Sequence, residues 1–363
     1  MGGSVMKPPV SRLAPVQWIR QNLFSTWYNT LLTLAVGWLL VTSVVPVFDW
    51  LIFGATFSGD GPGDCVGKGA CWLFINQRLN FFIYGFYPDA EQWRVDIMFA
   101  LLALSFVPQF IDRFPGRTWF GLFGLTGLPL CGYILIPGGW FGLEPVDSSK
   151  WGGLMLTLVI AYVGIIASLP IGVLLALGRR SEMPIIRGLC IVFIEVWRAV
   201  PLITVLFMAS VMLPLFLPAG VNFDNLLRAL IGVMLFSAAY MAEVVRGGLQ
   251  AIDKGQYEGA QAMGLSYWQT MRLIVLPQAL THVIPGIVNT FIGLFKDTTL
   301  VSIVGIFDLL GAGQSAVADA AWSTPVQAIT IYLYIGIIFF IFCFGMSRYS
   351  IFMENKLSKS RRH

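Results

Sequence analysis

The sequence GGLMLTLVIAYVGIIASLPIGVLLAL, residues 152–177, contains no charged residue over a length that can cross a lipid bilayer. The hydrocarbon core of a bilayer is roughly 30 Å thick, and a helix needs about 20 mostly apolar residues to span it. A bilayer-spanning strand would show a shorter segment of alternating polarity. This stretch therefore predicts a transmembrane helix.

Comparable apolar runs recur along the whole chain. Of its 363 residues, 57% are hydrophobic and only 12% are charged. The mean hydropathy of +0.76 lies well outside the range of soluble globular proteins. Besides 152–177, the runs cover residues 28–48, 95–111, 119–137, 189–217, 226–246, 278–299 and 326–346. They predict an all-α polytopic membrane protein with about eight transmembrane helices.

Lysine and arginine residues concentrate on one side of these spans. Of the 23 basic residues, 16 fall on that side: Lys7, Arg12, Arg20, Arg113, Arg117, Arg179, Arg180, Arg187, Arg246, Lys254, Arg272, Arg348, Lys356, Lys359, Arg361 and Arg362. Because cytoplasmic loops are enriched in Lys and Arg, both termini are predicted to be cytoplasmic. The net charge of +4 is therefore a bias of topology, and we expect no nucleic-acid surface.

Two of the five cysteines, Cys65 and Cys71, share the long external loop. In an oxidising compartment they can form a disulfide that closes a short loop; the alternative is a reduced pair without a role. The other three cysteines stand alone inside spans and are expected to be small hydrophobic residues.

The external loop also contains GDCVGKG, residues 63–69, which approaches the phosphate-binding pattern G-x-x-x-x-G-K-[ST]. Pro62 occupies the position of the first glycine, and Gly69 stands where a hydroxyl should hold magnesium. We therefore expect that this chain binds no ATP. His282 and His363 have no acidic or cysteine partners at ligand spacing, so no metal site and no catalytic residue are predicted.

The stretch GQYEGAQAMGLSYWQTMRLIVLP, residues 255–277, lies on the cytoplasmic side between the sixth and seventh spans and is too polar to cross a bilayer. Its small residues, Ala260 and Gly264 among them, thin one part of a helix. Tyr257, Tyr267 and Trp268 are large side chains that can fill a groove in another protein. Two interpretations stay open here: a docking helix, or an amphipathic helix that lies on membrane lipid.

This stretch resembles the coupling loop of ATP-binding-cassette (ABC) importer permeases, whose pattern is E-A-A, three residues, G, nine residues, I-x-L-P. The matching residues are Glu258, Gly259, Ala260, Gly264, Ile274, Leu276 and Pro277. Gly259 departs from the pattern because it replaces the first alanine, which keeps the small volume and costs about 1 kcal/mol of helix stability.

Further segments resemble permeases for polar amino acids: EVWRAVPL at 195–202, AAYMAEVVRGGLQAI at 238–252 and IGLFKDTTLVSIVGIFDLL at 292–310. Within that family, the chain is most similar to the M-type permease subunit of the general L-amino-acid transporter. The resemblance implies a type I importer in the bacterial inner membrane, with broad L-amino-acid specificity. A second, related permease would complete the pathway. Two copies of an ATPase subunit would bind ATP and magnesium, and a periplasmic binding protein would deliver the substrate.

The expected organisation has three parts. Residues 1–150 form an N-terminal extension with three transmembrane helices and a long periplasmic loop, 151–350 form a permease core of five helices, and 351–363 form a basic cytoplasmic tail. The extension either braces the core, contacts the partner permease, or offers the loop 49–94 to the binding protein.

Charged residues inside spans must face protein or water, because each costs several kcal/mol in hydrocarbon. Glu195 and Arg198 are spaced i, i+3 in the fifth span, and a structural ion pair between them is expected. The alternatives are contact with the coupling loop and direct substrate binding. Pro201 follows them and can bend the helix.

Polar side chains in the sixth and seventh spans are the candidate substrate pathway: Tyr240, Glu243, Lys296, Asp297 and Thr298. An amino-acid zwitterion needs a carboxylate for its ammonium group and a cation or hydroxyls for its carboxylate. Hydrogen bonds that only pack helices together are the alternative role. The competing function is a secondary transporter driven by an ion gradient, with Glu243, Lys296 and Asp297 as a relay, but such a transporter would not need a coupling loop.

Overall fold

The computed structural model describes residues 15–65, 67, 69–111, 114–218, 223–322 and 324–360. Several residues used in the sequence interpretation lie outside these ranges: Lys7, Arg12, Lys68, Arg113, Arg361, Arg362 and His363. The described residues form helices joined by short loops, with no strand beyond isolated bridges. The predicted all-α fold is thus confirmed.

Seven helical segments of the described chain are long and apolar enough to cross a membrane, and a bent helix pair makes an eighth. The seven contain helices α2 (Trp27–Phe48), α5 (Gln92–Phe106), α6 (Arg117–Leu135), α7 (Gly153–Arg179), α11 (Asn225–Gln250), α15 (Ile284–Asp297) and α17 (Pro325–Ser360). This confirms the expected number of about eight.

The fifth predicted span, 189–217, is not a single rod. It consists of α8 (Pro184–Ala199) and α9 (Leu202–Phe207), with a 102° bend between α8 and the segment that begins with α9. A π-helical turn (Met208–Met212) and α10 (Leu213–Phe216) follow α9. Val200 is extended, with φ −100° and ψ 133°, because the residue before a proline is disfavoured in the α region. Pro201 also has no N–H to continue the helix.

Contacts divide the chain into two compact units, of which the first comprises residues up to Phe74 together with 324–330. Here α1 (Pro15–Asn22) precedes α2, whose N-cap Thr26 accepts a hydrogen bond from the N–H of Asn29. Within the described chain, α2 buries no side chain. This is the behaviour of a helix whose surroundings are lipid.

The external loop of this unit contains a disulfide between Cys65 and Cys71, with the two Cα atoms 5.7 Å apart. The N–H of Cys71 donates to Thr330 Oγ1 at 3.1 Å, and the Trp72 indole donates to the Leu51 carbonyl at 2.9 Å. These bonds stabilise the loop around the disulfide.

The second unit, residues 75–323 and 331–363, contains all of the predicted permease core except residues 324–330. Its closest helix pair is α7 with α11. Gly172 makes this approach feasible, since a Cβ atom there would lie 2.7 Å from Met241 Cβ. Small residues at helix crossings are typical of membrane proteins, where close backbone packing replaces the hydrophobic effect.

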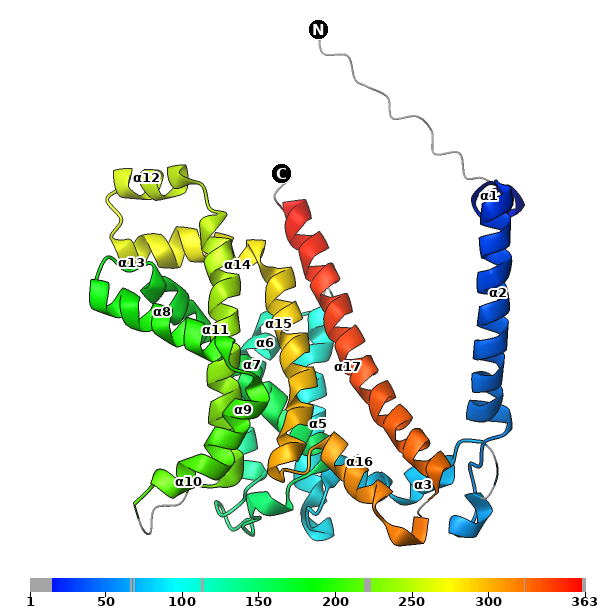
Figure 1. Cartoon of the computed structure of the whole chain (residues 1–363). Coiled ribbons are helices and arrows are strands. Elements are labelled where there is room, and N and C mark those ends of the chain that lie inside the picture. Colours follow the sequence, from blue (N-terminus) through cyan, green and yellow to red (C-terminus); the bar gives the residue numbers. More distant parts are fainter. Residues whose placement is uncertain are drawn as a thin grey trace. The chain divides into compact units, whose positions relative to one another are not determined.

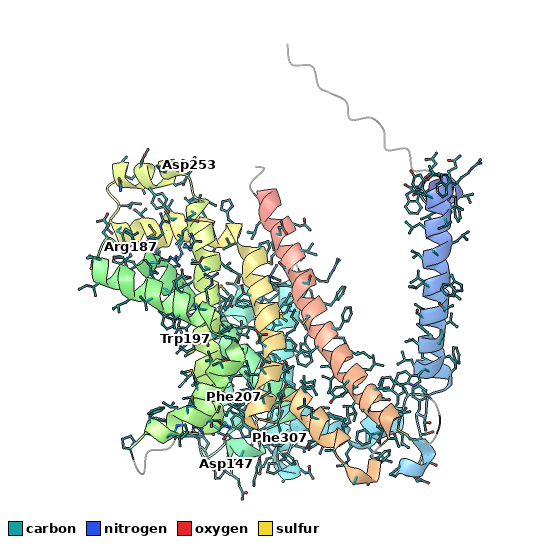
Figure 2. The ribbon with its side chains drawn as sticks, viewed as in Figure 1. Asp147, Arg187, Trp197, Phe207, Asp253 and Phe307 are labelled. Atoms are coloured by element: carbon teal, nitrogen blue, oxygen red, sulfur yellow. A yellow bond between two sulfur atoms is a disulfide. The ribbon has the colours of Figure 1, made fainter. Side chains whose placement is uncertain are left out.

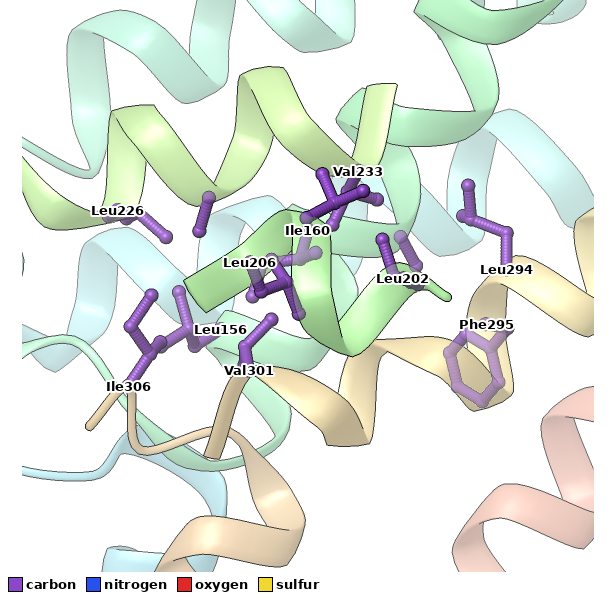
Figure 3. Packing of buried hydrophobic residues seen from close by; sticks show 13 residues of the cluster. Leu156, Ile160, Leu202, Leu206, Leu226, Val233, Leu294, Phe295, Val301 and Ile306 are labelled. Atoms are coloured by element: carbon purple, nitrogen blue, oxygen red, sulfur yellow. The ribbon is translucent and has the colours of Figure 1, made fainter. Parts of the chain in front are cut away.

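One hydrophobic cluster of this unit joins α7, α9, α11, α15 and the 3₁₀ segment Thr298–Val304. Figure 3 shows Leu206 of α9 among Leu156, Ile160 and Val301. Leu206 and Ile160 are fully buried. The packing of this cluster therefore fixes the outer half of the bent pair against the core.

Residues 75–150 belong to the same compact unit as the core, so the expected boundary at residue 150 does not separate two units. Tyr87, Val95 and Ile136 pack with Met155 of α7 in one buried cluster. Arg94 is 1% exposed; it pairs with Glu91, and its Nη1 donates to the Glu144 carbonyl at 2.7 Å. These contacts support bracing of the core as the role of this part of the extension.

Labelled residues mark the two ends of the second unit. Figure 2 shows Arg187 and Asp253 at one end and Asp147 and Phe307 at the other. The loop that contains Asp253 precedes α12 (Lys254–Ala262), and the C-terminal end of α17 lies at that same end (Figure 1).

Asp308 is completely buried and caps α16 (Leu309–Val317). Its carboxylate accepts hydrogen bonds from the N–H groups of Gly311 at 2.9 Å and Leu310 at 3.3 Å. Burial is the main cause that raises its pKa to about 7, against the lowering effect of these bonds.

This pKa predicts that stability falls as pH rises. The carboxyl has a pKa of about 3.9 when unfolded, so between about pH 4 and 7 the folded state binds more protons than the unfolded state. The free energy of unfolding should therefore decrease across that window, by at most about 4 kcal/mol, and stay level above it. Thermal unfolding of Asp308→Asn in detergent should lose this slope. Asp147→Asn, at an exposed loop position, is the matched control and should keep it. An unchanged slope in Asp308→Asn would contradict the assignment.

Candidate functional site

The predicted coupling loop forms two short helices past the C-terminal end of α11 (Figure 1). Asp253 begins α12 by accepting the N–H of Gly255 at 2.9 Å. Ser266 and Gln269 form a reciprocal capping box that begins α13 (Tyr267–Thr270). Such caps satisfy N–H groups that the first turn of a helix leaves unpaired.

Gly264 explains why the signature has a glycine between the two helices. Its φ of +74° lies in the left-handed region, which glycine adopts without a Cβ clash. The N–H of Leu265 then bonds the Ala260 carbonyl at 3.1 Å. The turn at Gly264 allows α13 to fold back beside α12.

The base of the loop is anchored in a buried cluster. Ala260 is only 2% exposed. Met271, Val275 and Ala279 pack with buried residues of α7 and α11, Ala176 and Leu249 among them. Pro277 lies in the first turn of α14 (Leu276–His282), where a missing N–H costs nothing. The loop is therefore a rigid continuation of the helical core.

The outer face of the loop exposes large side chains. Trp268 is 66% exposed, Tyr267 is 51% exposed, and their rings meet edge to face with centroids 5.4 Å apart. Glu258 and Gly259 are also exposed, and a Cβ at Gly259 would have nothing within 4 Å. An exposed aromatic pair on a rigid helical base is a surface that a partner protein can bind.

Tyr257 differs from the expected docking role, because it faces the membrane domain. Its hydroxyl accepts a hydrogen bond from Arg180 Nη1 at 3.1 Å and donates to the Leu249 carbonyl at 3.5 Å. The Arg180 guanidinium also lies 5.7 Å from the centre of the Tyr257 ring. The sequence identified the aromatic residues of this helix but not which side each one faces.

Glu243 is the centre of a charge cluster near the C-terminal ends of α7, α8 and α11. Arg246 donates to both of its carboxylate oxygens at 2.9–3.0 Å. Arg179 Nη1 lies 2.8 Å from Oε1, and Arg198 Nη1 lies 3.7 Å from Oε2. The Glu243 side chain is only 17% exposed. The three guanidinium groups neutralise its negative charge in place of water.

The predicted ion pair between Glu195 and Arg198 is wrong. Within the described residues, Glu195 pairs instead with Arg179 at 2.9 Å. Arg198 turns toward Glu243, and its guanidinium lies 5.7 Å from the centre of the Tyr240 ring. Pairing between helices brings α7, α8 and α11 together, which a pair inside α8 would not do.

The predicted pathway residues of the seventh span lie at the end of α15. The Thr298 hydroxyl is buried and donates to the Phe295 carbonyl at 2.8 Å, so it serves helix packing. Lys296 is exposed and Asp297 is half-buried. No hydrogen bond or ion pair joins these three side chains to Tyr240 or Glu243 among the described residues.

Sequence reasoning missed Arg179, Arg180 and Arg246 as parts of the site. The topology expected from the sequence already gave these basic residues a general explanation. The one other feature of the sequence that pointed to them is the excess of arginine near Glu195 and Glu243, since a buried carboxylate needs partners.

A recess of about 600 Å³ lies inside the bend between α8, the turn Met208–Met212 and α11. Its lining is apolar except for Arg228, whose Nη1 donates to the Ser210 carbonyl at 2.9 Å. Among the described lining residues there is no carboxylate. The recess therefore does not offer both charges that an amino-acid zwitterion requires.

The sequence pattern of a known family, described as binding-protein-dependent transport system inner membrane component, matches residues 168–348. An inner membrane amino-acid ABC transporter permease protein of Escherichia coli, YhdY, is 50% identical over 95% of this chain and 93% of its own length. The chain belongs to this family.

Two further similar proteins are also parts of amino-acid transport systems. The Rhodobacter capsulatus permease protein BztC, of a glutamate/glutamine/aspartate/asparagine transport system, is 41% identical over 98% of this chain and 96% of its own length. A solved structure of an amino acid ABC transporter with histidines has a TM-score of 0.50 and 28% identity, and covers 56% of this chain and 92% of that chain.

Membership makes this permease a transporter membrane component of the inner membrane and not an enzyme, with ATP hydrolysis on a separate subunit. ATPase and substrate-binding partners follow from the same membership. The type I permease core is confirmed by the family and by the solved structure. A transporter driven by an ion gradient is not favoured.

Proposed function

We propose that this permease carries L-amino acids into the cell and that α12 and α13 bind the ATPase. The observation that carries the proposal is the coupling signature on a rigid helix pair that exposes Tyr267 and Trp268. The substrate class rests on the relatives, which are amino-acid permeases. Broad specificity within that class is part of the proposal.

The assembly that fits this chain is a heterodimer with a second, related permease, two copies of an ATPase subunit and a periplasmic binding protein. ATP and magnesium would bind to the ATPase alone. Both termini would be cytoplasmic, on the side of α12. The apolar recess inside the bend is a surface that the second permease or membrane lipid can cover.

In the pathway, we assign the cation for the substrate carboxylate to Arg198. Its side chain is 35% exposed, and its only ion pair within the described residues is the 3.7 Å contact with Glu243. Tyr240 is 39% exposed beside it. Glu243 holds the arginines in place, which leaves Asp297 as the carboxylate for the substrate ammonium and Lys296 beside it.

The mechanism follows from these positions. ATP-driven closure of the ATPase dimer would move α12 and α13, and the rigid base of the loop would pass this movement to α7 and α11. The spans would then alternate between inward and outward opening around a fixed site. The binding protein would supply substrate at the outer end.

The test is purification of the complex from its native membrane in mild detergent, followed by reconstitution with the external fraction. We expect an ATPase and a second permease to co-purify, and ATP hydrolysis to rise several-fold with amino acids. The alternative would hold if the chain is recovered alone and uptake persists without ATP but collapses with an ionophore.

A further inference from the structure

Arg179, the last residue of α7, and Arg180, its C-cap, connect the coupling loop with the charge cluster. Arg179 Nη1 lies 2.8 Å from Glu243 and 2.9 Å from Glu195. Arg180 Nη1 donates to the Tyr257 hydroxyl and to the Leu249 carbonyl, each at 3.1 Å. Arg179 thus reaches the cluster, and Arg180, which has φ −95° and ψ 0° just past the end of the helix, reaches α12.

Each link in this connection is a direct contact within one compact unit. Tyr257 belongs to α12, and the next two residues of that helix, Glu258 and Gly259, are exposed. Leu249, whose carbonyl receives Arg180, is 1% exposed in the last turn of α11. Arg180 is therefore tied both to an element that the ATPase would move and to the buried end of a spanning helix.

The charge balance at the other end depends on Arg179. Arg179 is the ion-pair partner of Glu195 within the described residues, and it shares Glu243 with Arg198 and Arg246. If the end of α7 shifts, Glu195 loses its partner and Glu243 attracts Arg198 more strongly. Arg198 contacts the Tyr240 ring. A shift of α7 therefore changes the position of the exposed Arg198 guanidinium beside Tyr240.

We propose that Arg179 and Arg180 act together as the transmission element of this transporter: displacement of α12 pulls Arg180 through Tyr257, and Arg179 then changes its hold on Glu195 and Glu243. This rests on the proposed function, because it takes the ATPase as the source of the displacement. Arg180 is a positioning residue that touches neither nucleotide nor substrate. Coupling between two sites requires an element that both of them bias, and the end of α7 contacts both.

The experiment compares four variants of the reconstituted complete transporter: Arg180→Gln, Tyr257→Phe, the double variant, and Arg187→Gln as a control. Arg187 is an exposed arginine at the start of α8 on the same side. Three quantities are measured: the ATPase that co-purifies, the basal rate of ATP hydrolysis, and the ratio of hydrolysis with substrate-loaded binding protein to the basal rate.

We expect Arg180→Gln to retain the ATPase, because Trp268 is untouched, and to lose most of the several-fold stimulation, so that the ratio falls to about 1. Tyr257→Phe should lose a smaller part. The double variant should match Arg180→Gln, since both changes break one connection. Arg187→Gln should behave as wild type.

Full stimulation in Arg180→Gln, or additive losses in the double variant, would overturn the transmission role. Equal losses in Arg187→Gln would also overturn it, since they would show a general effect of charge. Failure of the proposed function would look different, because wild type itself would then bring no ATPase through purification.

Discussion

Replacing Glu243 with alanine should abolish transport and lower the stability of the permease markedly. The change leaves three guanidinium groups facing one another near the C-terminal ends of α7, α8 and α11. Removing one partner of a buried ion pair typically costs about 3–5 kcal/mol, because the remaining charge is uncompensated. The measurement is the midpoint of thermal unfolding in detergent, together with amino-acid uptake in cells.

Glu195→Ala is the matched control for this prediction. Its side chain is 53% exposed and pairs with the same Arg179, so solvent screens the lost interaction and we expect a cost below about 1 kcal/mol. If the two variants unfold at the same temperature, Glu243 is not the centre of the cluster. Glu243→Gln should lie between them, since an amide still accepts hydrogen bonds but carries no charge.

Trp268→Ala should release the ATPase from the membrane complex while the spans stay folded. Trp268 is 66% exposed, so its removal leaves no cavity in the permease. A central tryptophan in an interface commonly contributes about 2–4 kcal/mol, and its loss weakens binding by roughly 30-fold or more. The measurement is the dissociation constant between purified permease dimer and ATPase.

Trp119→Ala provides the control for the loss of an exposed tryptophan. Trp119 is 74% exposed at the start of α6, away from the coupling loop in sequence. It should leave ATPase binding unchanged. Wild-type affinity in Trp268→Ala would place the docking surface elsewhere.

The spanning helices could be predicted because hydropathy alone decides which segments a bilayer accepts. The bend in the fifth span could be expected from Pro201 but not its size. A proline interrupts hydrogen bonds locally, whereas the 102° angle depends on how Leu202 and Leu206 pack against other helices. The predicted boundary at residue 150 rested on Gly/Pro-rich loops, and such loops need not separate compact units: residues 75–150 lie in the same unit as most of the core.

The candidate site could be predicted only in part. The spacing from Glu258 to Pro277 identifies the coupling loop. The glycine in that pattern has a local structural reason, because the turn at Gly264 needs a positive φ. The direction of each side chain is a tertiary property, so the sequence could not show that Tyr257 contacts Arg180 while Trp268 is exposed. Glu195 and Arg198 were paired by spacing within one helix, yet Arg179 and Glu243 on other helices offered better-placed partners.

The central claim is that α12 and α13 are the surface through which an ATPase drives this permease. The most direct test places a photoreactive amino acid at position 268 and, as a control, at position 119, in the chain expressed in its native membrane. Illumination should cross-link position 268 to the ATPase subunit and leave position 119 without that product. An ATPase cross-link from position 119 but not from 268, in an assembled and transporting complex, would contradict the account.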